Sequence, residues 1–135
     1  MPITTGFNHL ATETADLDRL VGFYKDVFGG EVTFEMAATD DHPRMAIIDL
    51  GGGSALNVFE VPADSIIGDR RRQGGRGPID HFGLAVDSKS TLEAARDRLV
   101  AAGADIGEIQ RLGDAWSLFF RDPDGMELEV CAPGD

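Results

Sequence analysis

Three side chains far apart in the chain have the types and spacing of a metal site. His9 and His81 occupy matching places in two similar stretches of sequence, and Glu129 follows His81 at the same interval at which Asn57 follows His9. Two imidazoles and one carboxylate form the facial triad associated with non-haem Fe(II), and Zn(II), Mn(II), Ni(II) or Co(II) can also occupy such a set. A lone histidine on a strand is most often a core or surface residue. The repeated spacing is what favours one divalent metal ion here, with Asn57 as a weak or outer ligand.

The interval from His9 to His81, which we call the repeat offset, recurs between other positions and indicates an internal duplication. Gly53 pairs with Gly125 at this offset, and Leu56 pairs with Leu128. Both halves have the pattern strand, helix, strand, strand, strand, which predicts an α+β fold of two βαβββ modules. We therefore expect one domain over residues 1–135, made of a module 1–61, a linker 62–78 and a module 79–135.

Two amphipathic helices and eight strands are expected to position these residues. The first helix follows Asp16 and stops at Gly29, and the second begins with a capping box of Ser90 and Glu93 and stops at Gly103. The strands are expected at Gly6–Thr12, Glu31–Met36, Met45–Leu50 and Ala55–Val61 in the first module, and at Ile79–Val86, Ile106–Gln110, Trp116–Arg121 and Met126–Cys131 in the second.

Strand parity assigns the candidate ligands to one face of each sheet. Side chains alternate along a strand, so Glu127, Glu129 and Cys131 share a face while Leu128 and Val130 point to the opposite face, toward the helix. The mostly apolar lining expected on the ligand face suits a substrate with an aromatic or aliphatic body and an oxygen-bearing end, although ordinary core would have the same composition. The expected lining residues are Met45, Ile47, Ala55, Phe59, Ser117, Phe119 and, as a rim or acid-binding residue, Arg121.

Composition and charge exclude several classes of protein. The chain has 135 residues with a net charge of −12, which disfavours nucleic acid as a partner. No apolar run reaches the roughly 20 residues of a membrane span, and no export signal precedes the first strand, so a cytoplasmic protein is expected. Cys131 is the only cysteine. Four arginines at positions 70, 71, 72 and 76 fall in a glycine-rich stretch, which predicts a solvated linker.

The chain resembles the vicinal oxygen chelate superfamily, which includes glyoxalase I, epimerases, extradiol dioxygenases, thiol transferases and bleomycin resistance proteins. The resemblance lies in Asn8-His9-Leu10, in Asp80-His81, and above all in the segment 119–125, Phe-Phe-Arg-Asp-Pro-Asp-Gly, followed by Glu129. It implies that the two sheets form a half-open curved sheet around a cavity, with the helices outside. It also implies that Glu129 is a metal ligand and the catalytic residue through that metal.

The resemblance implies a divalent-metal-dependent enzyme that chelates a small oxygen-bearing substrate and acts by Lewis-acid catalysis. Four-ligand members carry Glu or Gln where this chain has Asn57, so dioxygenase-like or transferase- and lyase-like chemistry with three ligands is favoured over a glyoxalase I mechanism. The alternative is an antibiotic-binding resistance protein that sequesters its ligand without catalysis. A homodimer is expected in either case, with each metal site built within one chain or from two.

Overall fold

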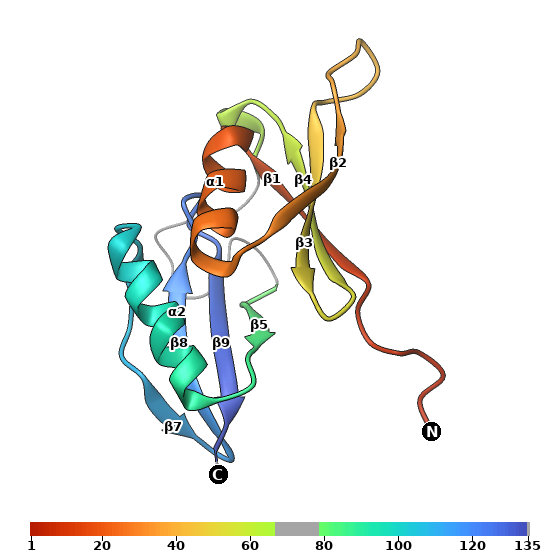
Figure 1. Ribbon diagram of the computed structural model, residues 1–135. Coiled ribbons are helices and arrows are strands. Elements are labelled where there is room, and N and C mark those ends of the chain that lie inside the picture. Colours follow the sequence, from red (N-terminus) through yellow and green to blue (C-terminus); the bar gives the residue numbers. More distant parts are fainter. Residues whose placement is uncertain (67–78, 135) are drawn as a thin grey trace. The chain divides into compact units, whose positions relative to one another are not determined.

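The computed structural model describes residues 1–66 and 79–134 and divides the chain into two compact units (Figure 1). Unit 1 spans Met1–Ile66 and unit 2 spans Ile67–Asp135. Each unit contains one helix packed on one mixed sheet, so the expected α+β class with two βαβββ-type halves is confirmed. Most of the expected linker, with its four arginines, lies outside the described residues.

Unit 1 is a four-stranded sheet with strand order β1-β4-β3-β2 and a single helix. Strands β1 and β4 are parallel, and the other neighbours are antiparallel. Its elements are β1 (His9–Thr14), α1 (Leu17–Phe28), β2 (Glu31–Met36), β3 (Met45–Gly51), β4 (Ser54–Glu60) and a 3-10 turn, η1 (Ala63–Ser65).

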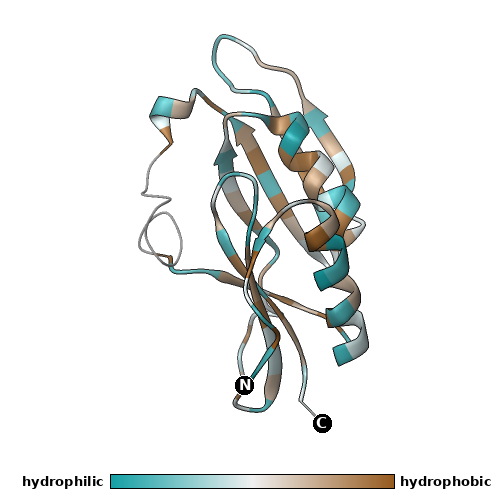
Figure 2. Cartoon of the chain, turned by 90° about the vertical axis from the view of Figure 1, so that its left-hand side faces the viewer, coloured by the Kyte–Doolittle hydropathy of each residue, from teal (hydrophilic) through white to brown (hydrophobic). Residues whose placement is uncertain are grey.

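Helix α1 has the ends that its sequence predicts. The Asp16 side chain accepts a hydrogen bond from the Arg19 amide, and Gly29 ends the helix at a φ of 68°, a left-handed conformation that suits glycine. Its apolar face is buried on the sheet, and Figure 2 shows hydrophilic and hydrophobic residues alternating along both helices. The buried residues are Leu17, Leu20, Phe23, Tyr24 and Val27.

Unit 2 repeats this plan with one irregularity. Its sheet has the order β5-β9-β8-β6, with β7 also paired to β8, so two short strands replace the single expected strand over residues 106–110. Its elements are β5 (Phe82–Ala85), α2 (Lys89–Ala101), β6 (Asp105–Ile106), β7 (Gln110–Leu112), β8 (Ala115–Arg121) and β9 (Glu127–Pro133).

Strand pairing shows the internal repeat directly. In unit 1, Asn57 pairs with Ala11 on one side and with Ile47 on the other. In unit 2, Glu129 pairs with Gly83 and with Phe119, which follow Ala11 and Ile47 by the repeat offset. The alignment of the two halves predicted from the sequence is therefore found in the strand pairing of both sheets.

Burial along β8 and β9 follows the predicted parity. Leu128 and Val130 are 3% and 0% exposed, and Leu118 and Phe120 on the neighbouring strand are equally well buried. Glu129 and Phe119 point to the other face and are only half-buried. The apolar face packs beneath α2, as burial of leucine, valine and phenylalanine side chains requires.

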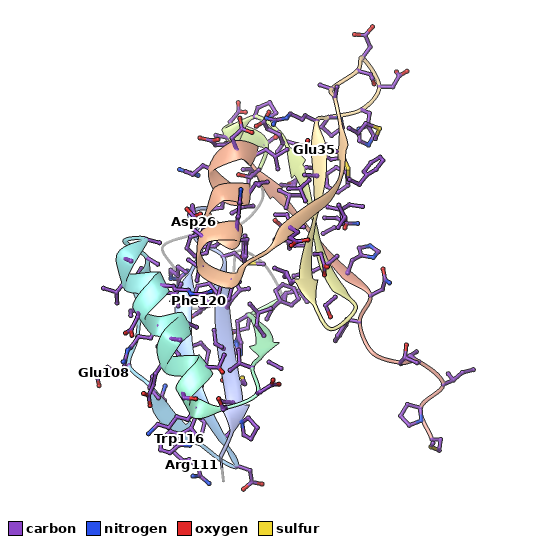
Figure 3. All side chains as sticks on the ribbon, viewed as in Figure 1. Asp26, Glu35, Glu108, Arg111, Trp116 and Phe120 are labelled. Carbon is purple, nitrogen blue, oxygen red and sulfur yellow. The ribbon has the colours of Figure 1, made fainter. Side chains whose placement is uncertain are left out.

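The half-buried ring of Trp116 lies at one end of unit 2 among cations. The Lys89 ammonium lies 4.1 Å from the ring centroid and the Arg111 guanidinium lies 5.3 Å from it, both within the range of a cation–π interaction. Figure 3 shows Arg111 beside Trp116 at this end of the sheet. The two cations therefore cover part of a ring that is only half-buried.

The predicted start of α2 is wrong by two residues. Ser88, not Ser90, is the N-cap: it has an extended backbone, and its side chain accepts a hydrogen bond from the Thr91 amide at 3.1 Å. The local sequence Ser88-Lys89-Ser90 offers two serines with similar capping patterns. The choice between them is made by where β5 ends and the chain turns onto the sheet.

Replacing the capping serine should destabilise the protein more than replacing its neighbour. Ser88→Ala should lower the free energy of unfolding by about 1 kcal/mol, because the Thr91 amide loses its acceptor. Ser90→Ala leaves the Thr91 amide bonded to Ser88. It should therefore lower the free energy of unfolding by less than about half of the loss in Ser88→Ala. Urea denaturation of both variants measures the difference, and equal losses would contradict the assignment of the cap.

Among the described residues, no helix is long and apolar enough to cross a lipid bilayer.

Candidate metal centre

Two of the three predicted ligands lie together on the open face of the unit 2 sheet. His81 immediately precedes β5, and Glu129 is in the centre of β9. The imidazole Nε2 of His81 lies 3.2 Å from Oε1 of Glu129. Gly83 pairs with Glu129 in the register, and a Cβ atom at Gly83 would meet only the Cys131 sulfur, at 3.8 Å, so no β5 side chain covers the carboxylate.

Both side chains are held by further hydrogen bonds. The Nδ1 atom of His81 lies 2.6 Å from Oδ1 of Asp80, and the buried Ser117 hydroxyl donates to Oε2 of Glu129. The other oxygen of Glu129, Oε1, therefore faces the imidazole. Hydrogen bonds of this kind orient metal-binding groups in known metal sites.

The geometry of this pair fits a divalent metal ion. Two donor atoms bound to one ion at about 2.1 Å and at a right angle to each other lie about 3.0 Å apart, close to the observed separation of 3.2 Å. Within residues 1–66 and 79–134, no three His, Cys, Asp or Glu side chains gather into a metal-binding group. A third such ligand for the His81–Glu129 pair would have to come from beyond the described sheet of unit 2.

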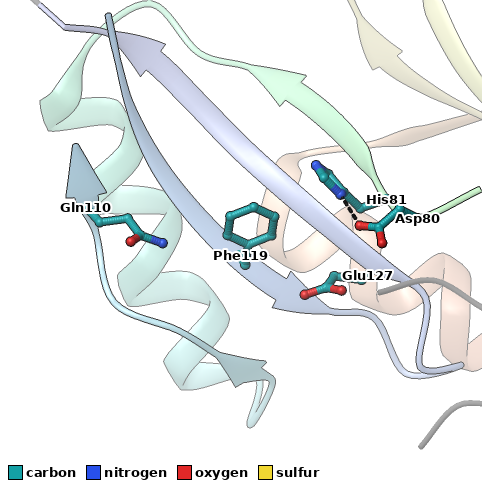
Figure 4. Close-up of a pocket in the computed structure, with 5 residues that line it drawn as sticks. All are labelled: Asp80, His81, Gln110, Phe119 and Glu127. Carbon is teal, nitrogen blue, oxygen red and sulfur yellow. Dashed lines mark hydrogen bonds and ion pairs between the residues drawn. The ribbon is translucent and has the colours of Figure 1, made fainter. Parts of the chain in front are cut away.

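A cavity of about 480 Å³ adjoins this pair (Figure 4). It is lined by Asp80, His81, Gln110, Phe119 and Glu127, so of the expected lining residues Phe119 is present. The lining of this cavity is more polar than the mostly apolar lining predicted from the sequence. Figure 4 shows Phe119 in the middle of the lining, with Gln110 from β7 on one side and Glu127 from β9 on the other.

Glu127 has a partner within its own sheet. Its carboxylate lies 3.8 Å from the Arg121 guanidinium, which also donates to the Gly125 carbonyl. The two residues are neighbours in the β8–β9 register, and both side chains are half-buried, as is that of Glu129. Arg121 therefore lies near enough to Glu127 to compensate its charge, and it is not among the residues that line the cavity.

The corresponding residues of unit 1 occupy equivalent positions in their own sheet. His9 is exposed at the start of β1, with its Nδ1 atom 2.8 Å from Oδ1 of Asn8. Asn57 is half-buried in β4 beside Ile47, and Met45 pairs with Phe59 two residues further along. His42, in the loop before β3, is half-buried, and its ring contacts Phe59.

Three residues that line the cavity, Asp80, Gln110 and Glu127, are not predicted from the sequence as site residues. In the sequence, Asp80 is distinguished only by its position next to His81. Gln110 belongs to a strand whose predicted bounds differ from the observed ones, and the alternation that includes Glu127 is equally typical of a surface residue.

Cys131 lies beside Glu129, and burial together with that carboxylate raises the pKa of its thiol to about 11. The thiol therefore stays protonated at neutral pH.

The pH dependence of folding should report the state of His81. The hydrogen bond to Asp80, followed by the contact with Glu129, raises the pKa of His81 in spite of partial burial. Because folding raises this pKa, the contribution to stability is complete below the unfolded value of about 6.5 and is lost as pH rises through the folded value.

For the metal-free protein, we expect the free energy of unfolding to fall by up to about 1 kcal/mol as the pH rises from below the unfolded pKa of His81 to above its folded pKa. This loss corresponds to the usual contribution of a partly exposed ion pair. His81→Gln should remove that part of the pH dependence. Chemical denaturation at a series of pH values measures both proteins, and parallel curves would contradict the assignment.

Comparison with known proteins places this geometry in a family. A sequence profile of the glyoxalase/bleomycin resistance protein/dioxygenase superfamily matches residues 6–130. The metallothiol transferase FosB of Shouchella clausii (strain KSM-K16) is 32% identical over 132 residues, which cover 95% of this chain and 80% of that protein.

Solved structures have the same fold. The glyoxylase/bleomycin resistance protein/dioxygenase domain from Frankia sp. EAN1pec superposes with a TM-score of 0.78 at 26% identity and covers 96% of this chain and 98% of its own. A mutant of the fosfomycin resistance protein FosX from Listeria monocytogenes, complexed with Mn(II) and a dihydroxypropylphosphonic acid, has a TM-score of 0.68 at 18% identity, with 95% and 90% of the chains covered. This chain belongs to the glyoxalase/bleomycin resistance protein/dioxygenase superfamily.

Proposed function

We propose that the protein is a divalent-metal-dependent enzyme that acts on a small oxygen-bearing organic substrate, with His9, His81 and Glu129 as metal ligands. The observation that carries this proposal is the approach of His81 Nε2 to Glu129 Oε1 at 3.2 Å on the open face of a sheet. His9 is the repeat equivalent of His81 and is the proposed third ligand, supplied by unit 1 of the same chain or of a second copy.

A divalent ion with open positions would bind substrate oxygens and stabilise negative charge that develops on them. The chain's own residues prepare the site for this role. Ser117 holds one oxygen of Glu129 and leaves the other toward His81, and Asp80 holds the opposite nitrogen of that imidazole. Asn57 is neutral, so the proposed ligand set has one carboxylate and leaves coordination positions for the substrate.

The cavity beside the pair supports a small substrate that combines a ring or aliphatic body with polar groups. Phe119 offers an apolar surface, and Gln110 and Glu127 offer hydrogen-bonding groups. Among the reaction types that the superfamily includes, we favour group transfer, because the chain is 32% identical to a metallothiol transferase over nearly its whole length. Ring cleavage with dioxygen is the second reaction type that a three-ligand site supports.

Metal analysis of anaerobically purified protein tests the proposal. We expect one divalent ion per chain, and the identity of the metal separates the reaction types, since iron favours a dioxygenase. His9→Ala should lose the ion, whereas His42→Ala should keep it, because His42 bonds the Pro43 carbonyl and contacts Phe59. A protein that binds no metal even after reconstitution, yet binds an antibiotic tightly, would instead be a sequestering protein.

We also propose that the protein is a homodimer, as the family resemblance implies. Sedimentation equilibrium at micromolar concentration measures the assembly state directly. A heterodimer of one His9→Ala chain and one Glu129→Ala chain, isolated from the mixed proteins, that recovers half of the wild-type metal content would indicate a site shared between two copies.

A further inference from the structure

We propose that Asp80 and Asn8 are positioning residues that turn the two histidine rings so that Nε2, and not Nδ1, is the metal donor. The inference rests on the metal site proposed above. It assigns a role to two residues that are not themselves proposed ligands.

The contact occurs in both halves of the molecule. Asp80 Oδ1 lies 2.6 Å from Nδ1 of His81, and Asn8 Oδ1 lies 2.8 Å from Nδ1 of His9. In each half the partner is the residue directly before the histidine, so the two pairs are related by the repeat offset. One half uses a carboxylate and the other an amide, so a side-chain oxygen acceptor is the feature that the two halves share.

The chemistry of the acceptor decides the tautomer. An ionised carboxylate can only accept hydrogen bonds, and so can the Oδ1 atom of an asparagine. Nδ1 of each ring therefore carries a proton in these contacts. Both neighbours of the His81 ring are acceptors, and the Asp80 contact at 2.6 Å is shorter than the Glu129 contact at 3.2 Å, so the neutral ring keeps its proton on Nδ1 and its lone pair on Nε2. In unit 2 this is the nitrogen that faces Glu129, at 3.2 Å.

The difference between the two acceptors makes the two histidines unequal. A carboxylate partner strengthens an imidazole donor more than a neutral amide does, because it stabilises the positive charge that the ring gains on binding a cation. His81 should therefore be the stronger ligand of the two. An Asn8→Asp change should make His9 more like His81 and tighten metal binding.

An ordinary exposed ion pair is the competing explanation, since the Asp80 side chain is 75% exposed. Three variants separate the two accounts. Asp80→Ala removes the acceptor and the charge, Asp80→Asn keeps an acceptor and removes the charge, and Glu127→Gln removes a charge from the same cavity without touching His81.

Calorimetric titration with Mn²⁺ alone is the first measurement. Asp80→Ala should weaken Mn²⁺ binding by about tenfold, the lower end of the effect of such outer residues, because the contact is exposed. Asp80→Asn and Glu127→Gln should each weaken it by less than about threefold. Equal losses in Asp80→Ala and Glu127→Gln would overturn the inference, because charge alone would then explain both.

The ¹⁵N chemical shifts of the His81 ring in metal-free protein at alkaline pH are the second measurement. We expect the Nδ1–H tautomer in the wild type and in Asp80→Asn, and the Nε2–H tautomer, which free histidine prefers in water, in Asp80→Ala. A wild type that already holds the Nε2–H tautomer would overturn the inference. If the wild type binds no Mn²⁺, the proposed function fails, and the ring shifts alone still decide whether Asp80 orients His81.

Discussion

Glu129→Ala should abolish stoichiometric metal binding and leave the fold intact. The carboxylate is the only anionic member of the proposed ligand set, and it is held by Ser117 with one oxygen toward His81. Loss of an anionic ligand removes both a donor atom and the negative charge that offsets the cation. The metal content should therefore fall from one ion per chain to a trace. Elemental analysis of dialysed protein measures the metal content, and circular dichroism checks the fold.

Glu127→Ala is the matched control for this experiment. Glu127 lies on the same strand and the same face two residues earlier, lines the cavity together with His81, and pairs with Arg121 instead of His81. It should retain about one ion per chain. Full metal content in Glu129→Ala, or equal loss in the two variants, would remove the basis for the enzyme proposal and favour a protein that binds its ligand without a metal.

Phe120→Ala should be among the most destabilising substitutions in unit 2. Its side chain is 1% exposed on the face of β8 that packs beneath α2. Truncation of a buried phenylalanine leaves a cavity and costs about 3–5 kcal/mol in the free energy of unfolding. Guanidinium denaturation of the metal-free protein measures this loss without a contribution from bound ions.

Phe119→Ala tests whether the neighbouring residue of the same strand points to the opposite face of the sheet. Phe119 is half-buried, lines the cavity, and contacts the His81 ring edge-to-face at a centroid distance of 5.1 Å. Its truncation should cost less than about half as much stability as that of Phe120, since part of the ring is already in water. A larger loss at Phe119 than at Phe120 would mean that the apolar face of β8 is the face that carries the ligands.

Local patterns were sufficient to predict the elements whose signals are periodic. Helix α1 begins and ends as Asp16 and Gly29 predict, and β2 has the predicted bounds. The repeat offset also predicted that Asn57 and Glu129 occupy equivalent positions, because a duplicated sequence that buries the same alternate residues keeps the same register. The alternation of Leu128 and Val130 with charged neighbours therefore predicted that Glu129 points away from the helix.

Tertiary contacts decided between alternatives that the local sequence patterns do not distinguish. Ser88 and Ser90 have similar capping potential, and only the path of the chain from β5 selects Ser88. Strands β6 and β7 are two and three residues long, too short for alternation to define them, so pairing with β8 creates them and brings Gln110 to the cavity. Tertiary packing also determines how far two polar side chains are buried. The His42 ring packs on Phe59, and the Glu127 carboxylate lies beside Arg121.

The hydrogen bond between Asp80 and His81 belongs to the same class of result. The sequence shows the two residues as neighbours, but adjacent side chains on an extended chain normally point to opposite faces. His81 lies just before β5, outside the regular strand, and there the backbone lets Asp80 reach Nδ1 while Nε2 faces Glu129 from a strand much further along the chain. Residue types and spacing thus identified the candidate ligands, whereas the orientation of the His81 ring depends on side-chain directions that only the folded backbone sets.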